Sequence, residues 1–310
     1  MPVTRRQFTK TSAAALAGAA LAGPLTARLL AQGPSPINWR RISRTARVIE
    51  GMGGNALVFV SGDETLLIDT KVAVVGDLTR NFVESADFKV IQVINTHHHA
   101  DHTGGNANWI ADTPILAHEL ARPRILAQHD RYGQSIRRRT PDAKIPPAEQ
   151  FAPTDTIEGD SEITIGKEKI SLRYFGPGHT DNDIAVHIPG ENILHAGDLL
   201  FHKMHPFIDL KGGANSAGWV KNVEELIKLC DNRTTVIPGH GPVTNVRSLE
   251  KQRDYLNNLR DTVAAAIKQG KSREETYRLP LPGTEHYESP KGLAYALSAV
   301  YKEMTTGADK

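Results

Sequence analysis

The feature that most constrains this chain is the hexapeptide His-His-His-Ala-Asp-His at residues 97–102. It directly follows an apolar run, Val90-Ile91-Gln92-Val93-Ile94, which predicts a buried strand. Several imidazoles and a carboxylate therefore stand at the end of a strand, where α/β proteins place their ligand sites. Clustered imidazoles repel one another once protonated, and a bound cation removes that penalty because neutral imidazole coordinates zinc and similar metals. The alternative is a solvated polar loop, which would fit a lone His-x-His better than this cluster.

Three more polar motifs follow downstream, each after an expected strand. In chain order they are Gly178-His179-Thr180, Gly197-Asp198 and Gly239-His240-Gly241. Together with His-x-His-x-Asp-His, this order resembles the metallo-β-lactamase-fold superfamily. The segment Ala56–Thr70, in which Asp69 follows Leu66-Leu67-Ile68, resembles the opening hairpin of that family. The resemblance covers roughly residues 45–270.

The resemblance implies an α/β fold, the αβ/βα four-layer sandwich in which two facing sheets carry helices outside. We expect one such domain at residues 31–310, with the C-terminal helices included. Composition predicts a hairpin turn at Ser61-Gly62-Asp63-Glu64, and a helix is expected to begin near Gly105. Residues 120–155 are rich in charge and proline, which predicts a long loop or loose helix over the site.

The family pattern also divides the ligands between two metal ions. By resemblance, the first ion is bound by His97, His99 and His179, the second by Asp101, His102 and His240, and Asp198 bridges both. Side-chain alternation in an extended segment sends His97 and His99 to one side and His98 to the other, so His98 is not expected to be a ligand. Such open coordination leaves room for a bridging water, as catalytic sites require.

The implied chemistry is hydrolysis by activated water. Two zinc ions about 3.5–4 Å apart lower the pKa of a shared water and clamp the attacking and leaving oxygens. Asp101 would orient the hydroxide and carry a proton to the leaving group. Asp69 would either accept a hydrogen bond from a ligand imidazole or cap the following turn. Iron or manganese also suits this ligand set.

Two further histidines, His202 and His205, follow Asp198 closely in the sequence. A loop at that position should reach the mouth of the pocket, so we expect one of them to contact substrate, with plain packing as the alternative. The remaining strand histidines, for example His118 and His187, are expected to be packed or surface residues.

The chain has 310 residues, 39% of them hydrophobic, and a formal net charge of +2. It carries no long basic stripe, so nucleic-acid binding has no electrostatic support, and a small-molecule substrate is expected. Residues 1–30 resemble a twin-arginine-type signal peptide, because Arg5-Arg6 precedes an Ala/Leu/Gly stretch too short to span a bilayer. We therefore expect a periplasmic or secreted protein without stable membrane insertion after processing; an uncleaved anchor is the alternative.

The ligand set narrows the function within the superfamily. It resembles glyoxalase II-like and lactonase-like hydrolases, and exported members described as cyclase-like, although lactonases often have Tyr where this chain has Phe201. We expect an exported dinuclear zinc hydrolase of an ester, lactone, thioester or amide bond, including β-lactams. The alternatives are a mononuclear iron oxidoreductase similar to persulfide dioxygenases and a non-catalytic metal-binding module. The sequence indicates no oligomeric state.

Overall fold

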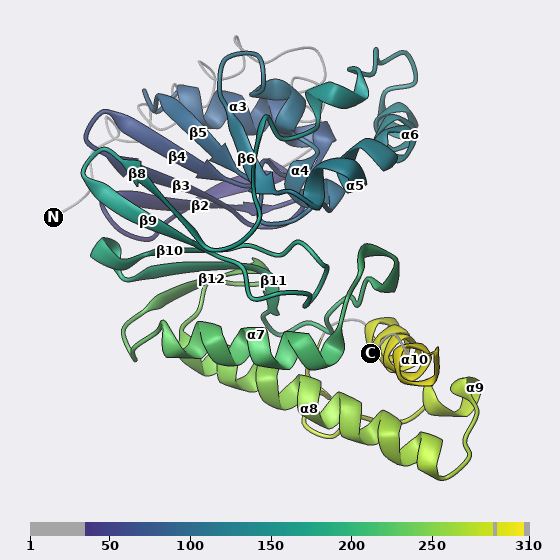
Figure 1. The fold of residues 1–310 in the computed structure, drawn as a ribbon. Coiled ribbons are helices and arrows are strands. Elements are labelled where there is room, and N and C mark those ends of the chain that lie inside the picture. The colour runs from purple at the N-terminus through teal and green to yellow at the C-terminus, as the bar shows by residue number, and fades with distance from the viewer. Residues whose placement is uncertain (1–34, 288–289, 307–310) are drawn as a thin grey trace, which may run out of the picture. The chain divides into compact units, whose positions relative to one another are not determined.

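The computed structural model describes residues 35–287 and 290–306, so the expected signal peptide at residues 1–30 lies outside the described residues. The chain divides into two compact units, and Figure 1 shows the elements of both. The first unit runs to Val93 and adds His99–Ile115 and Ile125–Thr154. The second unit holds Ile94–His98, Leu116–Arg124 and the chain from Asp155 onward. The boundary between the units therefore falls inside the histidine motif.

The strands form one seven-stranded sheet, in the order β1 to β7, and one five-stranded sheet, in the order β12-β11-β10-β9-β8. The strands of the larger sheet are β1 (Ile37–Arg41), β2 (Ala46–Gly51), β3 (Ala56–Ser61), β4 (Glu64–Ile68), β5 (Val90–Ile94), β6 (Ile115–His118) and β7 (Asp155–Ile157). Those of the smaller sheet are β8 (Ser161–Ile165), β9 (Glu168–Arg173), β10 (Ala185–Ile188), β11 (Ile193–Phe201) and β12 (Thr235–His240).

The helices alternate with these strands. The α-helices are α3 (Gly76–Glu84), α4 (Ala100–Thr103), α5 (Ala121–Ala127), α6 (His129–Arg139), α7 (Ser216–Lys228), α8 (Val246–Lys268), α9 (Arg273–Thr276) and α10 (Pro290–Thr306). Short 3-10 turns occur at η2 (Ala73–Val75), η3 (Asn106–Asn108), η4 (Ala148–Gln150), η5 (Pro189–Glu191) and η6 (Leu210–Gly212). No helix in the described part of the chain is long and apolar enough to cross a membrane.

In the first unit, the predicted hairpin is present. β3 and β4 pair antiparallel up to Ser61 and Glu64, which leaves a two-residue turn with Gly62 at a φ of 62°. That left-handed conformation is one that glycine adopts without strain. The core of this unit packs strand residues such as Val58 and Leu67 against Leu78 of α3 and against Trp109.

In the second unit, α7 and α8 run side by side along the five-stranded sheet (Figure 1). Side-chain oxygens of Asn215 and Asn245 cap the two helices by accepting backbone N–H groups of their first turns. The core of the unit contains Leu194 and Leu199 of β11 together with Trp219 of α7. Every residue of β11 is buried, as expected for a strand covered on both faces.

Two local predictions differ from the structure. Strand β11 does not end before the Gly-Asp motif but continues through it to Phe201, with register shifts around Gly197 at a φ of 53°. The glycine allows a bulge, so the strand includes Asp198. The helix expected near Gly105 begins earlier, at Ala100, and ends at Thr103. Of the two forms expected for residues 120–155, a long loop or a loose helix, the structure shows helices in the first half of the range, α5 and α6.

Candidate metal centre

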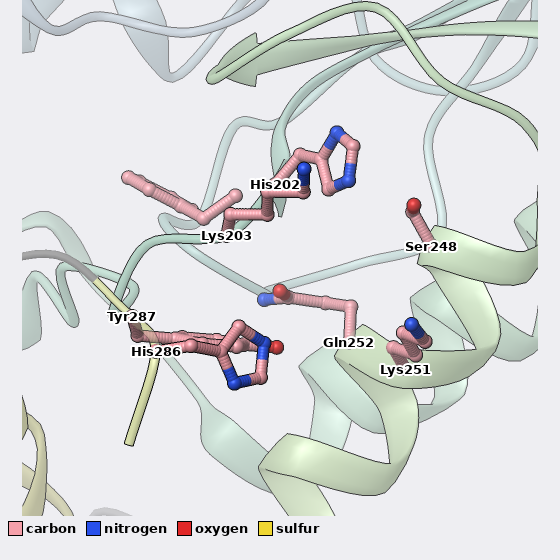
Figure 2. Close-up of a pocket in the computed structure, with 8 residues that line it drawn as sticks. His202, Lys203, Ser248, Lys251, Gln252, His286 and Tyr287 are labelled. Atoms are coloured by element: carbon pink, nitrogen blue, oxygen red, sulfur yellow. The ribbon is translucent and has the colours of Figure 1, made fainter. Parts of the chain in front are cut away.

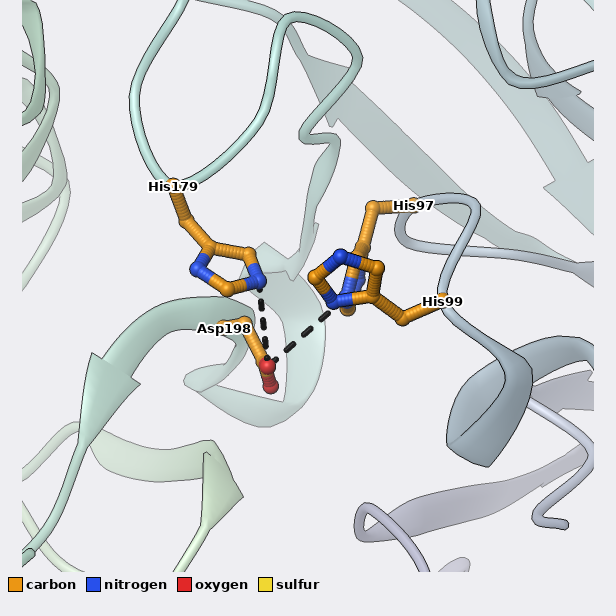
Figure 3. Close-up of side chains that lie close together, drawn as sticks. All are labelled: His97, His99, His179 and Asp198. Atoms are coloured by element: carbon orange, nitrogen blue, oxygen red, sulfur yellow. Dashed lines mark ion pairs between the residues drawn. The ribbon is translucent and has the colours of Figure 1, made fainter. Parts of the chain in front are cut away.

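Four predicted ligands belong to the second unit, and four different segments deliver them. His97 follows β5, His179 lies in the loop after β9, Asp198 stands within β11, and His240 is the last residue of β12. The side chains of His97, His179 and Asp198 are almost fully buried, and His240 is partly exposed. Figure 3 shows the imidazoles of His97 and His179 directed at the carboxylate of Asp198.

The imidazoles converge on one oxygen atom. The Nε2 atoms of His179, His240 and His97 lie 3.3, 3.4 and 3.7 Å from Oδ2 of Asp198. These separations exceed the usual range of about 2.7–2.9 Å for a charge-assisted hydrogen bond. The atoms therefore surround a point next to the carboxylate oxygen, and this arrangement is typical of ligands around a cation.

The hydrogen bond on the far side of His179 decides its tautomer. Its Nδ1 lies 2.7 Å from the backbone carbonyl oxygen of Phe207, and a carbonyl can only accept, so Nδ1 carries the proton. In the neutral imidazole, Nε2 then has a lone pair directed at the carboxylate of Asp198. Two acceptors facing each other in a buried site repel, and a cation between them turns that repulsion into attraction. The donor set of this unit thus fits a divalent metal ion.

The first unit holds a similar arrangement around His102. Its Nδ1 lies 2.7 Å from Oδ2 of Asp69, and both side chains are fully buried. Its Nε2 faces Oδ2 of Asp101 at 3.7 Å, and Asp101 keeps about a third of its side chain exposed. Of the two roles predicted for Asp69, the structure shows the hydrogen bond to the candidate ligand. Asp69 has a φ of 62°, a strained conformation that proteins tend to retain at functional sites.

Two residues that the sequence analysis missed support His102. A Cβ at Gly54 would lie 2.1 Å from Cε1 of His102, so only glycine leaves room for this imidazole. The buried Lys71 donates hydrogen bonds to the carbonyl oxygens of Ile49 and Gly54, at 3.1 and 2.5 Å, and so holds this segment in place. Burial lowers the pKa of Lys71 to about 8, against the opposing effect of the nearby carboxylates Asp101 and Asp69.

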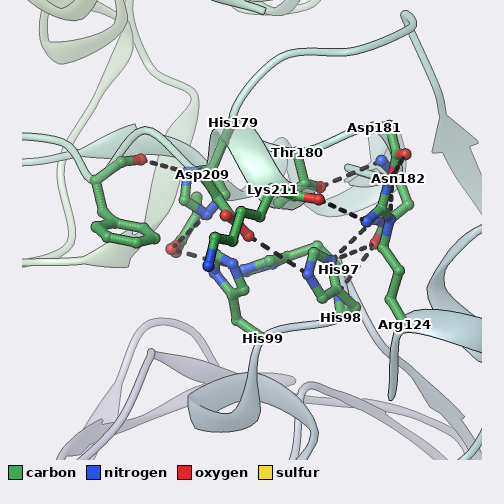
Figure 4. Close-up of polar contacts among 12 residues, drawn as sticks. His97, His98, His99, Arg124, His179, Thr180, Asp181, Asn182, Asp209 and Lys211 are labelled. Atoms are coloured by element: carbon green, nitrogen blue, oxygen red, sulfur yellow. Dashed lines mark hydrogen bonds and ion pairs between the residues drawn. The ribbon is translucent and has the colours of Figure 1, made fainter. Parts of the chain in front are cut away.

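His98 makes different contacts from its neighbour His97. Its backbone N–H donates to Oδ1 of Asn182 at 3.0 Å, and its Nδ1 lies 2.9 Å from Nδ2 of the same amide. Asn182 also donates to Asp181, which is bound in turn by the guanidinium of Arg124 (Figure 4). This network occupies Nδ1 of the ring, while Nε2 lies 3.6 Å from Oδ2 of Asp209. The expectation that His98 is not a ligand stays a prediction. His99 begins the adjoining segment of the first unit, where its carbonyl accepts the N–H groups of His102 and Thr103.

The two histidines expected at substrate have separate surroundings. His202 bonds through Nδ1 to the carbonyl oxygen of Pro242 and lines a small pocket. Nδ1 of His205 lies 2.9 Å from the hydroxyl of Tyr255, and its ring also packs near Tyr287. These contacts give His205 the packing role that was the alternative, whereas His202 keeps access to a pocket; contact with substrate stays a prediction for both.

A buried carboxyl beside the cluster supports the loop that carries His179. Asp183 accepts hydrogen bonds from the backbone N–H and the hydroxyl of Thr180, both at 2.8 Å. Burial raises the pKa of Asp183 to about 8, although the hydrogen bonds from Thr180 oppose the shift. Asp183 could not be recognised from the sequence, because an Asp four residues after a ligand forms no distinctive pattern.

The fold and these sites define a metal-dependent α/β enzyme class. The sequence profile of the metallo-beta-lactamase superfamily matches residues 49–254, more than half of the chain, and the protein belongs to that superfamily. The family prediction from the sequence is confirmed, and so is the prediction of a metallo-hydrolase at the level of enzyme class.

Individual relatives agree with this assignment. A probable metallo-hydrolase of Bacillus subtilis (strain 168), YqgX, is 26% identical over 72% of this chain and 99% of its own length. A hydroxyacylglutathione hydrolase of Maricaulis maris (strain MCS10) is 31% identical over 44% of this chain and 43% of its own. The structure of a metallo-beta-lactamase from Pontibacter korlensis matches with a TM-score of 0.57 and 19% identity, over 72% of this chain and 99% of that one. The structural likeness confirms the predicted fold class.

Proposed function

We propose that this protein is a hydrolase that uses two divalent metal ions, zinc in the first instance, to activate water against a small-molecule ester, lactone, thioester or amide. The proposed ligands are His97, His99, Asp101, His102, His179, Asp198 and His240. The observation that carries this proposal is the convergence of three Nε2 atoms on Oδ2 of Asp198 within one unit. Family membership supports the same reading, because relatives in it include a probable metallo-hydrolase and a hydroxyacylglutathione hydrolase.

Residues around the ligands keep two of the imidazoles in their metal-binding form. The carbonyl of Phe207 accepts a hydrogen bond from Nδ1–H of His179, and the carboxylate of Asp69 accepts one from Nδ1–H of His102, so that each Nε2 keeps its lone pair. When bound, a metal pair supplies Lewis acidity, which makes water nucleophilic near neutral pH and stabilises negative charge on the attacked oxygen. The partly exposed carboxylate of Asp101 would orient the water and pass its proton to the leaving group.

The test combines metal analysis with a substrate panel. We expect about two zinc ions per chain and chelator-sensitive hydrolysis of at least one lactone, thioester, ester or β-lactam. Asp198→Asn keeps the side-chain volume and should lower metal content to below about one ion per chain while abolishing hydrolysis. His187→Ala, which removes a half-exposed histidine of β10, is the matched control and should change neither. One iron per chain with oxygen uptake on a persulfide would contradict the proposal.

We further propose that the mature protein is exported to the periplasm or secreted. The support is Arg5-Arg6 followed by a short stretch rich in Ala, Leu and Gly in the N-terminal sequence. Replacing both arginines by lysine should leave the full-length chain in the cytoplasm, and fractionation of the producing cells measures this. Export of the double variant at the normal level would refute a twin-arginine route.

A further inference from the structure

A small pocket in the second unit adjoins the histidine cluster of that unit. Phe201 lines the pocket and also stacks on the imidazole of His240, with ring centroids 5.2 Å apart and an angle of 17°. His202 and Lys203, directly after β11, line it from one side, and Ser248, Lys251 and Gln252 of α8 line it from another (Figure 2). A group bound there would lie next to the ligand His240 without displacing it.

The pocket is electropositive. Lys203 and Lys251 line it, and no Asp or Glu is among the lining residues. Ser248 belongs to the first turn of the 23-residue helix α8, whose N-terminal end carries partial positive charge. The pocket therefore favours an anion.

A buried amide points to a bound partner. Gln252 is only 3% exposed, and its Nε2 has no hydrogen-bond partner among the described residues. Figure 2 shows its amide extending between His202 and Tyr287. Buried donors are almost always satisfied by protein, water or ligand. Lys203 adds a second sign of a constrained site, because it holds a φ of 64° that a non-glycine residue seldom adopts.

The volume of the pocket limits the size of the anion that it can hold. The cavity measures about 40 Å³. One water molecule needs roughly 10–15 Å³ on this measure, so about three non-hydrogen atoms fit. That is the size of a carboxylate group, and a phosphate with its ester substituent is larger.

We propose that this pocket binds a carboxylate of the substrate, distinct from the bond that is hydrolysed, with Lys203, Lys251 and Gln252 as its partners. The inference rests on the proposed hydrolase function and narrows its substrates to small molecules that carry a free carboxylate. The pocket adjoins Phe201, whose ring stacks on the imidazole of the proposed metal ligand His240.

Binding can be measured without catalysis. Acetate should shift the side-chain amide resonance of Gln252 in the NMR spectrum of the metal-loaded protein, and neutral acetamide should not. Lys251→Met should raise the acetate dissociation constant, measured from that resonance, about tenfold. This is the loss of affinity expected when one charged hydrogen-bond partner is removed. Lys268→Met, at the exposed far end of the same helix, is the control and should leave it unchanged. An unmoved Gln252 resonance would mean that the pocket holds only ordered water. An unchanged acetate dissociation constant in Lys251→Met would overturn the assignment of Lys251 as a partner of the carboxylate.

Kinetics separate this inference from the proposed function. Two substrates are compared, one that carries the free carboxylate and its carboxamide analogue. Lys251→Met should raise KM about tenfold for the carboxylate substrate and leave KM for the carboxamide unchanged, so the ratio of their kcat/KM values falls by the same factor. Equal effects on both substrates would overturn the substrate assignment while leaving the hydrolase in place. Acetate binding at Gln252 in a protein that hydrolyses no member of the panel would instead refute the hydrolase and retain the pocket as an anion site.

Discussion

Replacing Gly54 by Ala tests the second metal position without removing any ligand. Gly54 has no left-handed φ, so alanine fits its backbone, and the three atoms nearest the added Cβ all belong to the His102 imidazole. That Cβ would lie 2.1 Å from Cε1 and 2.3 Å from Nε2 of the ring. Carbon atoms settle at about 3.5–4.0 Å, so the ring must retreat by about 1.5 Å. Metal–ligand distances tolerate only about 0.2 Å, and the movement therefore removes His102 from the coordination.

The expected result is a selective loss. Gly54→Ala should bind one ion with near-normal affinity and the other at least about 100-fold more weakly, as measured by titration of the metal-free protein with zinc. Gly159→Ala is the matched control, because a Cβ there meets nothing within 4 Å. Two ions bound by Gly54→Ala with unchanged affinities would refute the assignment of His102. Loss of both ions would refute the separate role of the two positions.

Three further perturbations follow from the contacts described above. Lys71→Met should lower the free energy of unfolding in urea by about 2–4 kcal/mol, because the buried carbonyls that accept from its ammonium lose their donor. This loss outweighs the gain from no longer burying a charged ammonium. Unchanged stability would show that these hydrogen bonds contribute nothing. The Cys230 thiol, whose pKa burial raises to about 11, should react with iodoacetamide at pH 8 about 100-fold more slowly than in the urea-unfolded chain; equal rates would rule out the shift. His98→Ala should keep both metal ions while lowering stability by about 1–2 kcal/mol through the lost contact with Asn182, and metal loss would mean that the ligand register is displaced by one residue.

The family, the fold class and the candidate ligands could be predicted because they depend on patterns of residues that lie close together in the sequence. Each ligand follows or ends an apolar run, so strand prediction and ligand prediction reinforce each other. Asp69 was found in the same way, as an acidic residue after three buried apolar residues of β4. The side-chain direction of His98, opposite to that of His97 and His99, could be predicted because side chains alternate in an extended segment.

Other parts of the sites could not be read from the sequence, because they depend on segments that meet only in the folded chain. Gly54 shows no special backbone angle, and its significance is its distance from an imidazole 48 residues later. Lys71 reads as an ordinary surface cation until its carbonyl partners are known. The helix α6 was underestimated because its composition is strongly polar, and only a few residues such as Tyr132 and Ile136 mark its buried face.

The hydrogen-bond partners of His102 and His179 differ in charge, and in the proposed two-ion site this difference would make the two ion positions chemically unequal. His102 shares its proton with a buried carboxylate, whereas His179 shares its proton with a neutral carbonyl. Sharing with an anion pushes more electron density toward Nε2, so His102 is the stronger donor. The proposed site would then bind its two ions with unequal affinity, and at low metal concentration the enzyme would pass through a half-loaded state before it becomes fully competent.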